Sequence, residues 1–301
     1  MKRILVCDPI DEKAVARLRE LGYDVVVKTG MDEDELVRTV PGFHCMIVRS
    51  ATKVTARVIE AMDEMKIVLR GGVGIDNIDS AAAKAKGVKV RNTPGASSRA
   101  VAELTVGLMF ALARHITKAD ASMQAGKWEK KKFKGTELAG KTLGLIGSGR
   151  IGGEVARMAR ALGMEVIAYD PYITAFEHGE LVSSLDEVLT RADYVSLHVP
   201  LTDETRHMLS AEQFAKMKPT AYVVNCARGG VVDEAAFAKA VREGTVAGGA
   251  FDVYEQEPPA DTPLAGLDSV IMTPHVGAST AEAQARIGGE LVDIITEELP
   301  L

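Results

Sequence analysis

The chain has 301 residues, of which 47% are hydrophobic and 26% charged, a composition suited to about two domains of ordinary size. Its formal net charge of −6 argues against a nucleic-acid partner, because binding to a phosphate backbone normally requires an excess of Lys and Arg. The 3 cysteines have neither metal-site spacing nor the pattern of a disulfide framework, so we expect reduced thiols, no metal and a cytoplasmic location.

Residues 1–90 alternate short β-rich runs with segments of helical periodicity. The predicted strands are Arg3–Cys7, Tyr23–Val27, Cys45–Val48 and Ile67–Leu69. The predicted helices are Lys13–Leu21, Asp32–Val40 and Thr55–Met62. The first apolar run is too short for a signal peptide. Continuous apolar runs of this kind are typical of parallel strands covered on both faces, so the pattern predicts a small doubly wound α/β domain.

A long apolar helix is predicted from Ser98 to His115, and a second helical stretch continues to Gly126. The apolar part of the first helix contains Glu103 and is too short for a membrane span, so we expect no membrane association. A basic loop, Lys127–Lys134, follows. Strands and helices then alternate again, at Lys141–Ile146, Ile151–Leu162, Glu165–Tyr169, Leu185–Arg191, Tyr194–Val199 and Tyr222–Cys226, and a last helix is predicted over Thr280–Glu298. The pattern predicts a second α/β unit in series with the first.

A glycine-rich turn follows the predicted strand that ends at Ile146, with glycines at Gly147, Gly149 and Gly152. Alone, a G-x-G-x-x-G spacing is a weak signal, and a plain βα turn would satisfy it. Here a strand precedes it, a helix follows it, and Asp170 ends the next strand. In that context the glycines allow a tight turn and the approach of a pyrophosphate to a helix N-terminus, and the carboxylate accepts ribose hydroxyls. The motif predicts a dinucleotide site that favours NAD over NADP.

A second glycine cluster, Gly71–Gly74, follows the strand that ends near Leu69 but lacks the third glycine. It is interpreted either as a plain turn or as a turn whose N–H groups receive a carboxylate. The residues alone leave both interpretations open.

Three side chains suited to hydroxy-acid chemistry follow predicted strand ends in the last quarter of the chain: Arg228, Glu257 and His275. A guanidinium binds a carboxylate with two parallel hydrogen bonds. An imidazole exchanges the hydroxyl proton, and a carboxylate beside it fixes its tautomer. Taken singly, each residue has an ordinary alternative as a surface or structural group. Ligands of open α/β sheets bind outside the carboxyl ends of the strands, where all three are expected.

These motifs resemble those of the D-isomer-specific 2-hydroxyacid dehydrogenases over essentially all 301 residues. The resemblance is carried by four segments: Gly147–Gly152, Asn225–Glu234, Glu257–Pro259 and Pro274–Thr280. It implies that Arg228 anchors the substrate, that His275 is the acid/base and that Glu257 is its partner. It also implies a flavodoxin-like substrate domain of residues 1–93 and 284–301, into which a Rossmann NAD domain of residues 94–283 is inserted. A homodimer formed through the helix after Ser98 is implied as well.

The resemblance further implies a set of cofactor-binding residues: Gly147, Gly149, Arg150, Ile151, Gly152, Asp170, Thr205, Cys226, Asp252 and Gly277. The basic loop and its surroundings, Lys127–Leu138, resemble in particular the D-3-phosphoglycerate dehydrogenases of this family. On that basis the resemblance implies a phosphorylated 2-hydroxy acid as substrate, and we expect D-3-phosphoglycerate, oxidised to 3-phosphohydroxypyruvate for serine biosynthesis.

The same resemblance assigns the substrate's groups to further residues. Its phosphate would be bound by Arg49, Lys53 and Arg70, together with Lys130 from a second subunit, unless the basic loop is only a solvated turn. Its carboxylate would be bound at the turn containing Gly72 and Val73, beside Arg228. The chain stops at Leu301, shortly after the last helix, so it is either a short form without a regulatory domain or a truncated piece of a longer enzyme. In both cases we expect no inhibition by serine.

Two alternatives stay open. Within the family, the chain is a glyoxylate or hydroxypyruvate reductase if the basic residues do not bind phosphate. From another class, a corepressor-like protein would use the fold as an NAD-gated binding module, although the compact chain has no additional tail for such a role.

Overall fold

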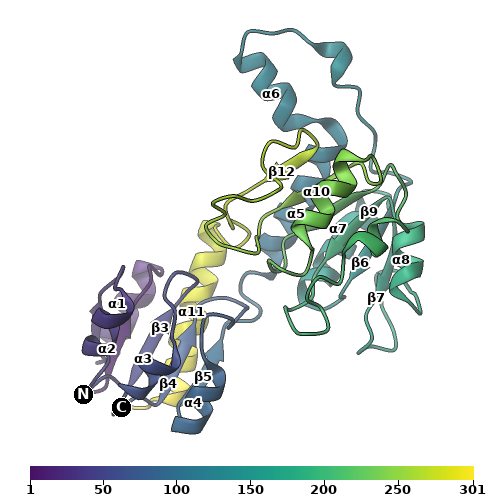
Figure 1. Ribbon diagram of the computed structural model, residues 1–301. Coiled ribbons are helices and arrows are strands. Elements are labelled where there is room, and N and C mark those ends of the chain that lie inside the picture. The colour runs from purple at the N-terminus through teal and green to yellow at the C-terminus, as the bar shows by residue number, and fades with distance from the viewer. The chain divides into compact units, whose positions relative to one another are not determined.

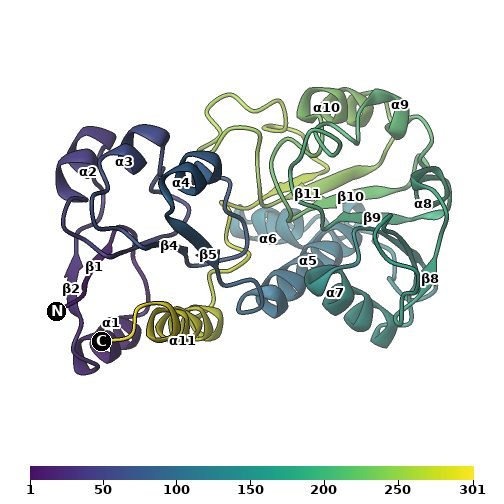
Figure 2. The same cartoon turned by 90° about the horizontal axis from the view of Figure 1, so that it is seen from below.

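The computed structural model describes residues 1–301, which form two compact units. The first unit comprises Met1–Ser97 and Ala278–Leu301, and the second comprises Ser98–Gly277. Each contains one parallel sheet with helices on both faces (Figure 1, Figure 2). The expected fold class, two doubly wound α/β domains with one inserted into the sequence of the other, is confirmed.

The sheet of the first unit has the strand order β2-β1-β3-β4-β5, and every pair is parallel. Its strands are β1 (Arg3–Val6), β2 (Asp24–Val27), β3 (Cys45–Val48), β4 (Ile67–Arg70) and β5 (Lys89–Asn92). Its helices are α1 (Glu12–Glu20), α2 (Glu33–Thr39), α3 (Ala56–Glu60), α4 (Ser80–Lys86) and α11 (Ala281–Glu298). This order is the flavodoxin-like form of the doubly wound fold.

Alternate residues of β1 enter different cores because side chains of a strand point to opposite faces in turn. Ile4 and Val6 share a core with Leu291 of α11, whereas Leu5 shares the opposite core with Leu36 of α2. Figure 2 shows α1 and α11 on one side of this sheet and α2, α3 and α4 on the other. Both faces are therefore buried, which explains the uninterrupted apolar runs of the sequence.

The last helix, α11, completes the first unit, although the whole second unit separates it from β5 in the chain. Leu291 and Ile295 are fully buried, and each such side chain contributes about 1.5–3 kcal/mol through the hydrophobic effect. The Tyr23 hydroxyl donates to the Leu299 carbonyl at 2.7 Å, and Arg91 pairs with Glu298 at 2.7 Å. The first unit thus depends on both ends of the chain.

The sheet of the second unit has the order β12-β11-β10-β9-β6-β7-β8, again parallel throughout. Its strands are β6 (Thr142–Ile146), β7 (Glu165–Tyr169), β8 (Glu180–Leu181), β9 (Tyr194–Leu197), β10 (Tyr222–Asn225), β11 (Gly248–Phe251) and β12 (Val270–Met272). Its helices are α5 (Ser98–Arg114), α6 (Ile116–Gln124), α7 (Arg150–Ala161), α8 (Leu185–Arg191), α9 (Ala211–Phe214) and α10 (Glu234–Arg242). This is the Rossmann order with one further strand, and its switch point lies between β6 and β9.

Two cores hold this second sheet between helical layers. Val224 of β10 shares one core with Val155 of α7, and the neighbouring Val223 shares the other with Phe237 of α10. Figure 2 shows α5 and α7 on one side and α8, α9 and α10 on the other. The carboxyl ends of the strands are left at one edge between these layers, where the loops that follow them gather.

Residues 116–134, here called the projecting segment, extend from the rest of the second unit (Figure 1). The segment contains α6 and, within the predicted basic loop, a 3-10 turn over Lys130–Lys132. Glu129 stabilises this turn by accepting from Lys132 Nζ at 2.6 Å and from Ser122 Oγ at 3.0 Å. No single helix is long and apolar enough to cross a membrane; only α5 and α6 together reach that length and composition, and they are bent by 65°.

Candidate active site

The three residues expected to carry the chemistry follow three adjacent strands of the second unit. Arg228 comes after β10, Glu257 after β11 and His275 after β12, and these strands are neighbours in the sheet. Parallel strands end at the same edge, so the structure gathers all three loops on one side of the unit.

His275 and Glu257 form a direct pair. His275 Nδ1 lies 2.7 Å from Glu257 Oε2, and both side chains are about one-third exposed, at 39% and 35%. Burial acts to raise the pKa of Glu257, but the hydrogen bond and charge of His275, the Tyr254 N–H and the charge of Arg228 outweigh it, so that this pKa lies below its usual value. Glu257 therefore stays ionised beside the imidazole and fixes which ring nitrogen faces it.

The loop that carries His275 is held by a buried carboxylate. Asp252, 1% exposed, accepts from the backbone N–H groups of Val276 and Gly277, each at 2.8 Å, and from Thr273 Oγ1 at 2.6 Å. His275 itself has a φ of 52°, a left-handed conformation that is uncommon for a residue with a side chain. Strain of this kind persists where surrounding bonds enforce it, and it is frequent at functional sites.

Arg228 is held by its neighbours in the loop after β10. Its backbone carbonyl accepts from Asn225 Nδ2 at 2.9 Å, and its Nη1 donates to the Ala227 carbonyl at 2.6 Å. Asn225 Oδ1 also accepts from the Ala227 N–H at 3.1 Å. The amide of Asn225 thus closes a compact turn that presents the guanidinium beyond the strand.

The turn after Arg228 packs directly against the loop that carries Glu257. A Cβ added to Gly229 would lie 1.7 Å from the Tyr254 carbonyl oxygen, which is backbone and has no room to move aside. We predict that Gly229→Ala lowers the free energy of unfolding by about 1–3 kcal/mol or more through overpacking. Thermal denaturation checks this, with Gly107→Ala as the control, because a Cβ there meets nothing within 4 Å. Equal melting temperatures for the two variants would contradict the predicted close packing.

The glycine-rich turn has the shape of a phosphate cradle. Gly147 has a φ of 88°, and a Cβ on it would lie 2.7 Å from the His198 carbonyl oxygen. A Cβ on Gly152 would lie 2.5 Å from the Gly147 carbonyl oxygen. Gly149 directly precedes the 12-residue helix α7, and no side chain caps that end, so the N–H groups of the first helical turn remain available to an anion.

Two side chains beside this turn also fit a dinucleotide. Asp170 Oδ2 accepts from the Ser148 N–H at 2.9 Å and from Ser148 Oγ at 3.1 Å, which holds the carboxylate next to the glycine turn. His198 has a buried Nδ1 with no hydrogen-bond partner, and burial lowers the pKa of this histidine to about 4, so the ring is neutral. The cradle, the uncapped helix end and the fixed carboxylate together fit the phosphates and ribose of NAD.

The remaining expected cofactor residues all belong to the second unit. Arg150 and Ile151 form the first turn of α7, and Thr205, in the loop after β9, donates from Oγ1 to the Pro200 carbonyl at 2.6 Å. Cys226 is 7% exposed, and burial raises the pKa of its thiol to about 12. Its side chain is therefore a neutral thiol and not a nucleophile.

The expected substrate residues other than Arg228 and Lys130 lie in the first unit, near the carboxyl ends of β3 and β4. Arg70 ends β4, and its guanidinium covers Gly72, where a Cβ would lie 1.7 Å from Arg70 Nη1. Arg49 follows β3 and lies against Gly71, and burial lowers the pKa of its guanidinium despite the neighbouring charge of Asp8. The carbonyl of Val73 accepts from Asn92. Lys53 comes four residues after Arg49, in the same loop region.

Lys130 is not at a strand end but in the 3-10 turn of the projecting segment. Sequence reasoning also gave no role to three residues that shape the site: Ser148, Asn225 and Tyr254. Ser148 and Tyr254 are recognisable only by their hydrogen bonds, because their partners, Asp170 and Thr273, are 22 and 19 positions away. Asn225 had the one local signal, its place at the last position of a strand just before Arg228.

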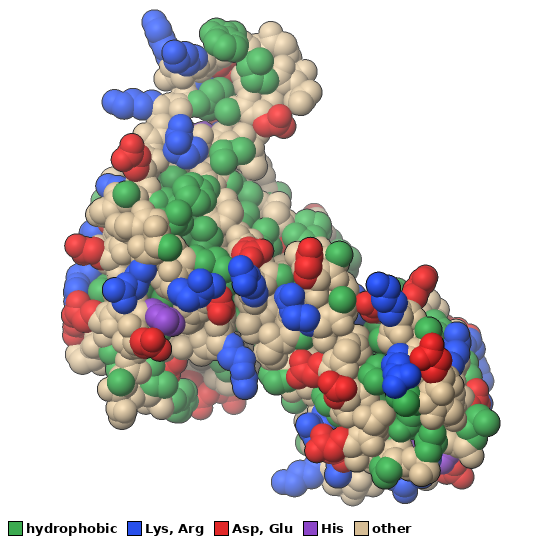
Figure 3. Space-filling model, turned by 180° about the vertical axis from the view of Figure 1, so that it is seen from behind, with side chains coloured by type: hydrophobic (Ala, Val, Ile, Leu, Met, Phe, Trp, Pro, Cys, Tyr) green, Lys and Arg blue, Asp and Glu red, His purple; other side chains and the backbone are tan.

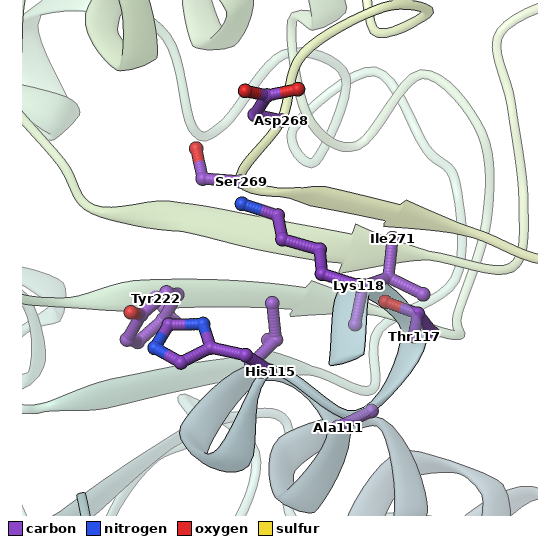
Figure 4. Close-up of a pocket in the computed structure, with 9 residues that line it drawn as sticks. Ala111, His115, Thr117, Lys118, Tyr222, Asp268, Ser269 and Ile271 are labelled. Atoms are coloured by element: carbon purple, nitrogen blue, oxygen red, sulfur yellow. The ribbon is translucent and has the colours of Figure 1, made fainter. Parts of the chain in front are cut away.

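A pocket elsewhere in the second unit is separate from this site. It is lined by His115, Lys118, Tyr222 and Ser269, among others, where α5 and α6 meet β10 and β12 (Figure 4). Tyr222 begins β10 and Ser269 precedes β12, so the pocket lies at the amino ends of the strands. The candidate catalytic set, Arg228, Glu257 and His275, follows the opposite ends.

Comparison with known proteins assigns the family. A model of the D-isomer specific 2-hydroxyacid dehydrogenase NAD binding domain matches residues 106–277. A D-3-phosphoglycerate dehydrogenase of Methanocaldococcus jannaschii is 51% identical over 99% of this chain and 58% of its own length. A hydroxypyruvate reductase of Thermotoga maritima is also 51% identical, over 99% of this chain and 98% of its own length.

Solved structures agree with this assignment. The D-lactate dehydrogenase of Aquifex aeolicus, complexed with NAD and lactic acid, has a TM-score of 0.87 and 30% identity, covering 98% of this chain and 94% of that one. The chain thus spans about three-fifths of one similar enzyme, at 58% of its length, and nearly all of two others. This protein belongs to the D-isomer specific 2-hydroxyacid dehydrogenase family, and residues 106–277 match the NAD-binding domain of that family.

Proposed function

We propose that this protein transfers a hydride between NAD and a D-2-hydroxy acid. The observation that carries the proposal is the pair of His275 Nδ1 and Glu257 Oε2, 2.7 Å apart. Their loops follow β12 and β11, which continue the sheet from β10, the strand before Arg228. An acid/base, the carboxylate that orients it and a cation suited to a carboxylate are thereby combined in one unit with a dinucleotide cradle.

The residues divide the work in the following way. Arg228 binds the substrate carboxylate and polarises the oxygen on C2. Glu257 holds His275 through Nδ1, so that Nε2 takes the hydroxyl proton during oxidation and returns it during reduction. The ionised Glu257 also stabilises the imidazolium that forms. NAD, when bound, accepts the hydride from C2 of the acid.

NAD is proposed over NADP because Asp170 is anchored beside the glycine turn. Asp170→Ser should shift the ratio of kcat/KM values toward NADP by about 10- to 100-fold, since hydrogen bonds to a charged group contribute about 1.5–3 kcal/mol. Initial rates with each cofactor, and dissociation constants from the fluorescence of bound NADH and NADPH, measure this shift. Asp268→Ser, at the separate pocket, is the control. An unchanged ratio would mean that Asp170 does not face the ribose.

The proposed substrate is D-3-phosphoglycerate, oxidised to 3-phosphohydroxypyruvate in serine biosynthesis. Support comes from the basic side chains of the first unit, Arg49, Lys53 and Arg70, which would bind the phosphate, and from the relatives of that name. The glycine turn at Gly72 and Val73 would receive the carboxylate together with Arg228. Lys130, from a second subunit, would add to the phosphate site.

A hydroxypyruvate reductase is the second candidate, because the Thermotoga maritima relative of that name is equally similar. NADH formation from D-3-phosphoglycerate, D-glycerate and D-lactate distinguishes the two, with NADH oxidation by hydroxypyruvate as the reverse assay. Strong selectivity for D-3-phosphoglycerate supports the phosphate site. Equal or better turnover of the unphosphorylated acids would leave the hydride chemistry in place and remove the phosphate assignment.

We further propose a cytoplasmic homodimer. The three cysteines are free and buried, as suits a reducing compartment. Four large hydrophobic side chains are exposed on α5 and the projecting segment: Phe110, Ile116, Met123 and Trp128. Figure 3 shows Lys or Arg side chains beside hydrophobic ones on the projecting segment. A second copy would cover this apolar surface, and sedimentation equilibrium of Trp128→Glu against the unaltered protein tests that assembly.

A further inference from the structure

A buried carboxylate outside the proposed mechanism joins two of the site's loops. Glu234 is the first residue of α10 and is 5% exposed. Its Oε1 accepts from the Glu255 N–H at 2.7 Å, and its Oε2 accepts from Thr262 Oγ1 at 2.8 Å. In return, the Glu234 N–H donates to Glu255 Oε1 at 3.1 Å. The two glutamates therefore bond reciprocally across 21 positions of sequence.

The loops joined in this way carry the candidate catalytic set. Glu234 follows Arg228 by six positions, and Glu255 precedes Glu257 by two. Between them the backbone of Gly229 packs directly on the Tyr254 carbonyl, where even a Cβ would not fit. A shift of residues 254–257 would therefore change the place of the Glu257 carboxylate relative to Arg228.

Tyr254 connects this contact to Glu257 and to Thr273, which lies between β12 and His275. Its N–H donates to Glu257 Oε1 at 3.1 Å, and its hydroxyl lies 2.8 Å from the Thr273 carbonyl. Glu257 Oε1 is thus held by backbone while Oε2 meets His275 Nδ1. Hydrogen bonds and the short backbone segment 254–257 thus connect Glu234 with the imidazole within the second unit.

We propose that Glu234 is a positioning residue for the acid/base pair. Its carboxylate fixes residues 254–257 against the Arg228 turn, so that Glu257 meets His275 in one geometry. This inference rests on the proposed roles of Glu257 and His275. The hydrogen bonds to the buried Glu234 carboxylate are charge-assisted, and such bonds are strong where water is excluded. They therefore hold residues 254–257 in one position.

Asp233 supplies a matched control, because it precedes Glu234 at the same helix end and also accepts a backbone N–H. Asp233 Oδ1 caps α10 by accepting from the Ala236 N–H at 2.9 Å, and Oδ2 accepts from Ser210 Oγ at 2.9 Å. Neither bond reaches residues 254–257. Loss of Asp233 therefore weakens the start of α10 without releasing the loop of Glu257.

Glu234→Ala should lower kcat by about 10- to 100-fold, the effect of a misplacement of the order of an ångström at a reacting group. The dissociation constant of NADH, measured by fluorescence, should be unchanged. Glu234→Gln keeps an oxygen acceptor for the Glu255 N–H and should recover most of the activity. Asp233→Ala should lower the melting temperature while kcat stays near that of the unaltered enzyme. In the apo protein, hydrogen–deuterium exchange of residues 253–259 should rise in Glu234→Ala and not in Asp233→Ala.

A double-mutant cycle with His275→Ala separates positioning from general stability. If Glu234 acts through the acid/base pair, Glu234→Ala has no further effect on kcat once His275 is absent. Multiplied effects of the two changes would overturn the inference, and so would unchanged kcat in Glu234→Ala. Should Glu234→Ala fail to fold, Glu234→Asp, whose carboxylate is one methylene short of Glu255, replaces it in the same cycle. Unaltered activity of His275→Ala alone would instead refute the proposed function, whatever Glu234 does.

Discussion

His275→Ala is expected to lower kcat/KM for oxidation of the hydroxy acid by about 10²–10⁴-fold, the usual contribution of a general acid/base. The imidazole is the one group in the candidate set that both binds and releases a proton, and Glu257 holds it through Nδ1 at 2.7 Å. Without it, the hydroxyl proton leaves to water as the hydride departs. NADH binding should persist, because the glycine cradle and Asp170 belong to other loops.

Steady-state rates and NADH titration by fluorescence measure these two effects. His115→Ala is a suitable control, since His115 also has a left-handed φ, at 53°, but lies at the separate pocket. A His275→Ala enzyme that kept kcat/KM within a factor of about three would exclude His275 as the acid/base, because such a loss is far below the range for that role. A parallel loss of NADH binding would indicate a collapsed site instead.

The parallel sheets were predictable because their central strands are apolar on both faces. β3 and β7 begin and end at the predicted residues, and β1, β2, β4 and β10 differ from the prediction by one residue at an end. The sequence did not indicate β5 and β8, and the reason is physical. Both are edge strands, and each pairs with a single neighbouring strand. The sequence of β5 is Lys-Val-Arg-Asn, and β8 has only two residues. Edge strands need not be apolar, and charged residues there discourage aggregation.

The boundaries between the two units are less evident from the sequence than the strands are. The family resemblance implied boundaries at 93/94 and 283/284, and the second of these positions lies inside α11, which begins at Ala281. The compact units meet at Ser97/Ser98 and Gly277/Ala278. Periodicity locates a helix but does not indicate which of its turns leaves one core for another, because the contacts that decide this are distant in sequence.

In the candidate site as well, the sequence indicates residue types but not the hydrogen bonds that these residues make. Residue chemistry and strand ends indicated Arg228, Glu257 and His275 as a candidate set, and the resemblance implied that Glu257 is the partner of His275; the structure adds their contact at 2.7 Å. Asp252 was expected at the cofactor; its observed bonds hold the His275 loop through N–H groups 24 and 25 positions away. Backbone partners carry no residue-type signal, so a sequence does not reveal them.

Arg228→Ala is expected to lower kcat/KM by roughly 30- to 5000-fold, because truncating one partner of a desolvated charge pair costs about 2–5 kcal/mol. The loss should appear in both KM and kcat, since the guanidinium binds the substrate carboxylate in the ground state and polarises the C2 oxygen as charge develops. Arg228→Lys should recover only part of it, because an ammonium lacks the planar fork that binds a carboxylate with two bonds.

The measurement is a comparison of kcat, KM and NADH affinity among these variants and Arg242→Ala, an arginine whose side chain bonds only the Pro263 carbonyl at the surface. If Arg228→Ala raised KM alone, the guanidinium would be a binding group without a part in the chemical step. If neither constant changed, the carboxylate would be bound elsewhere, and the glycine turn at Gly72 and Val73 would be the remaining candidate. Since the guanidinium is proposed both to bind the carboxylate and to polarise the C2 oxygen, a loss confined to KM is the less expected result.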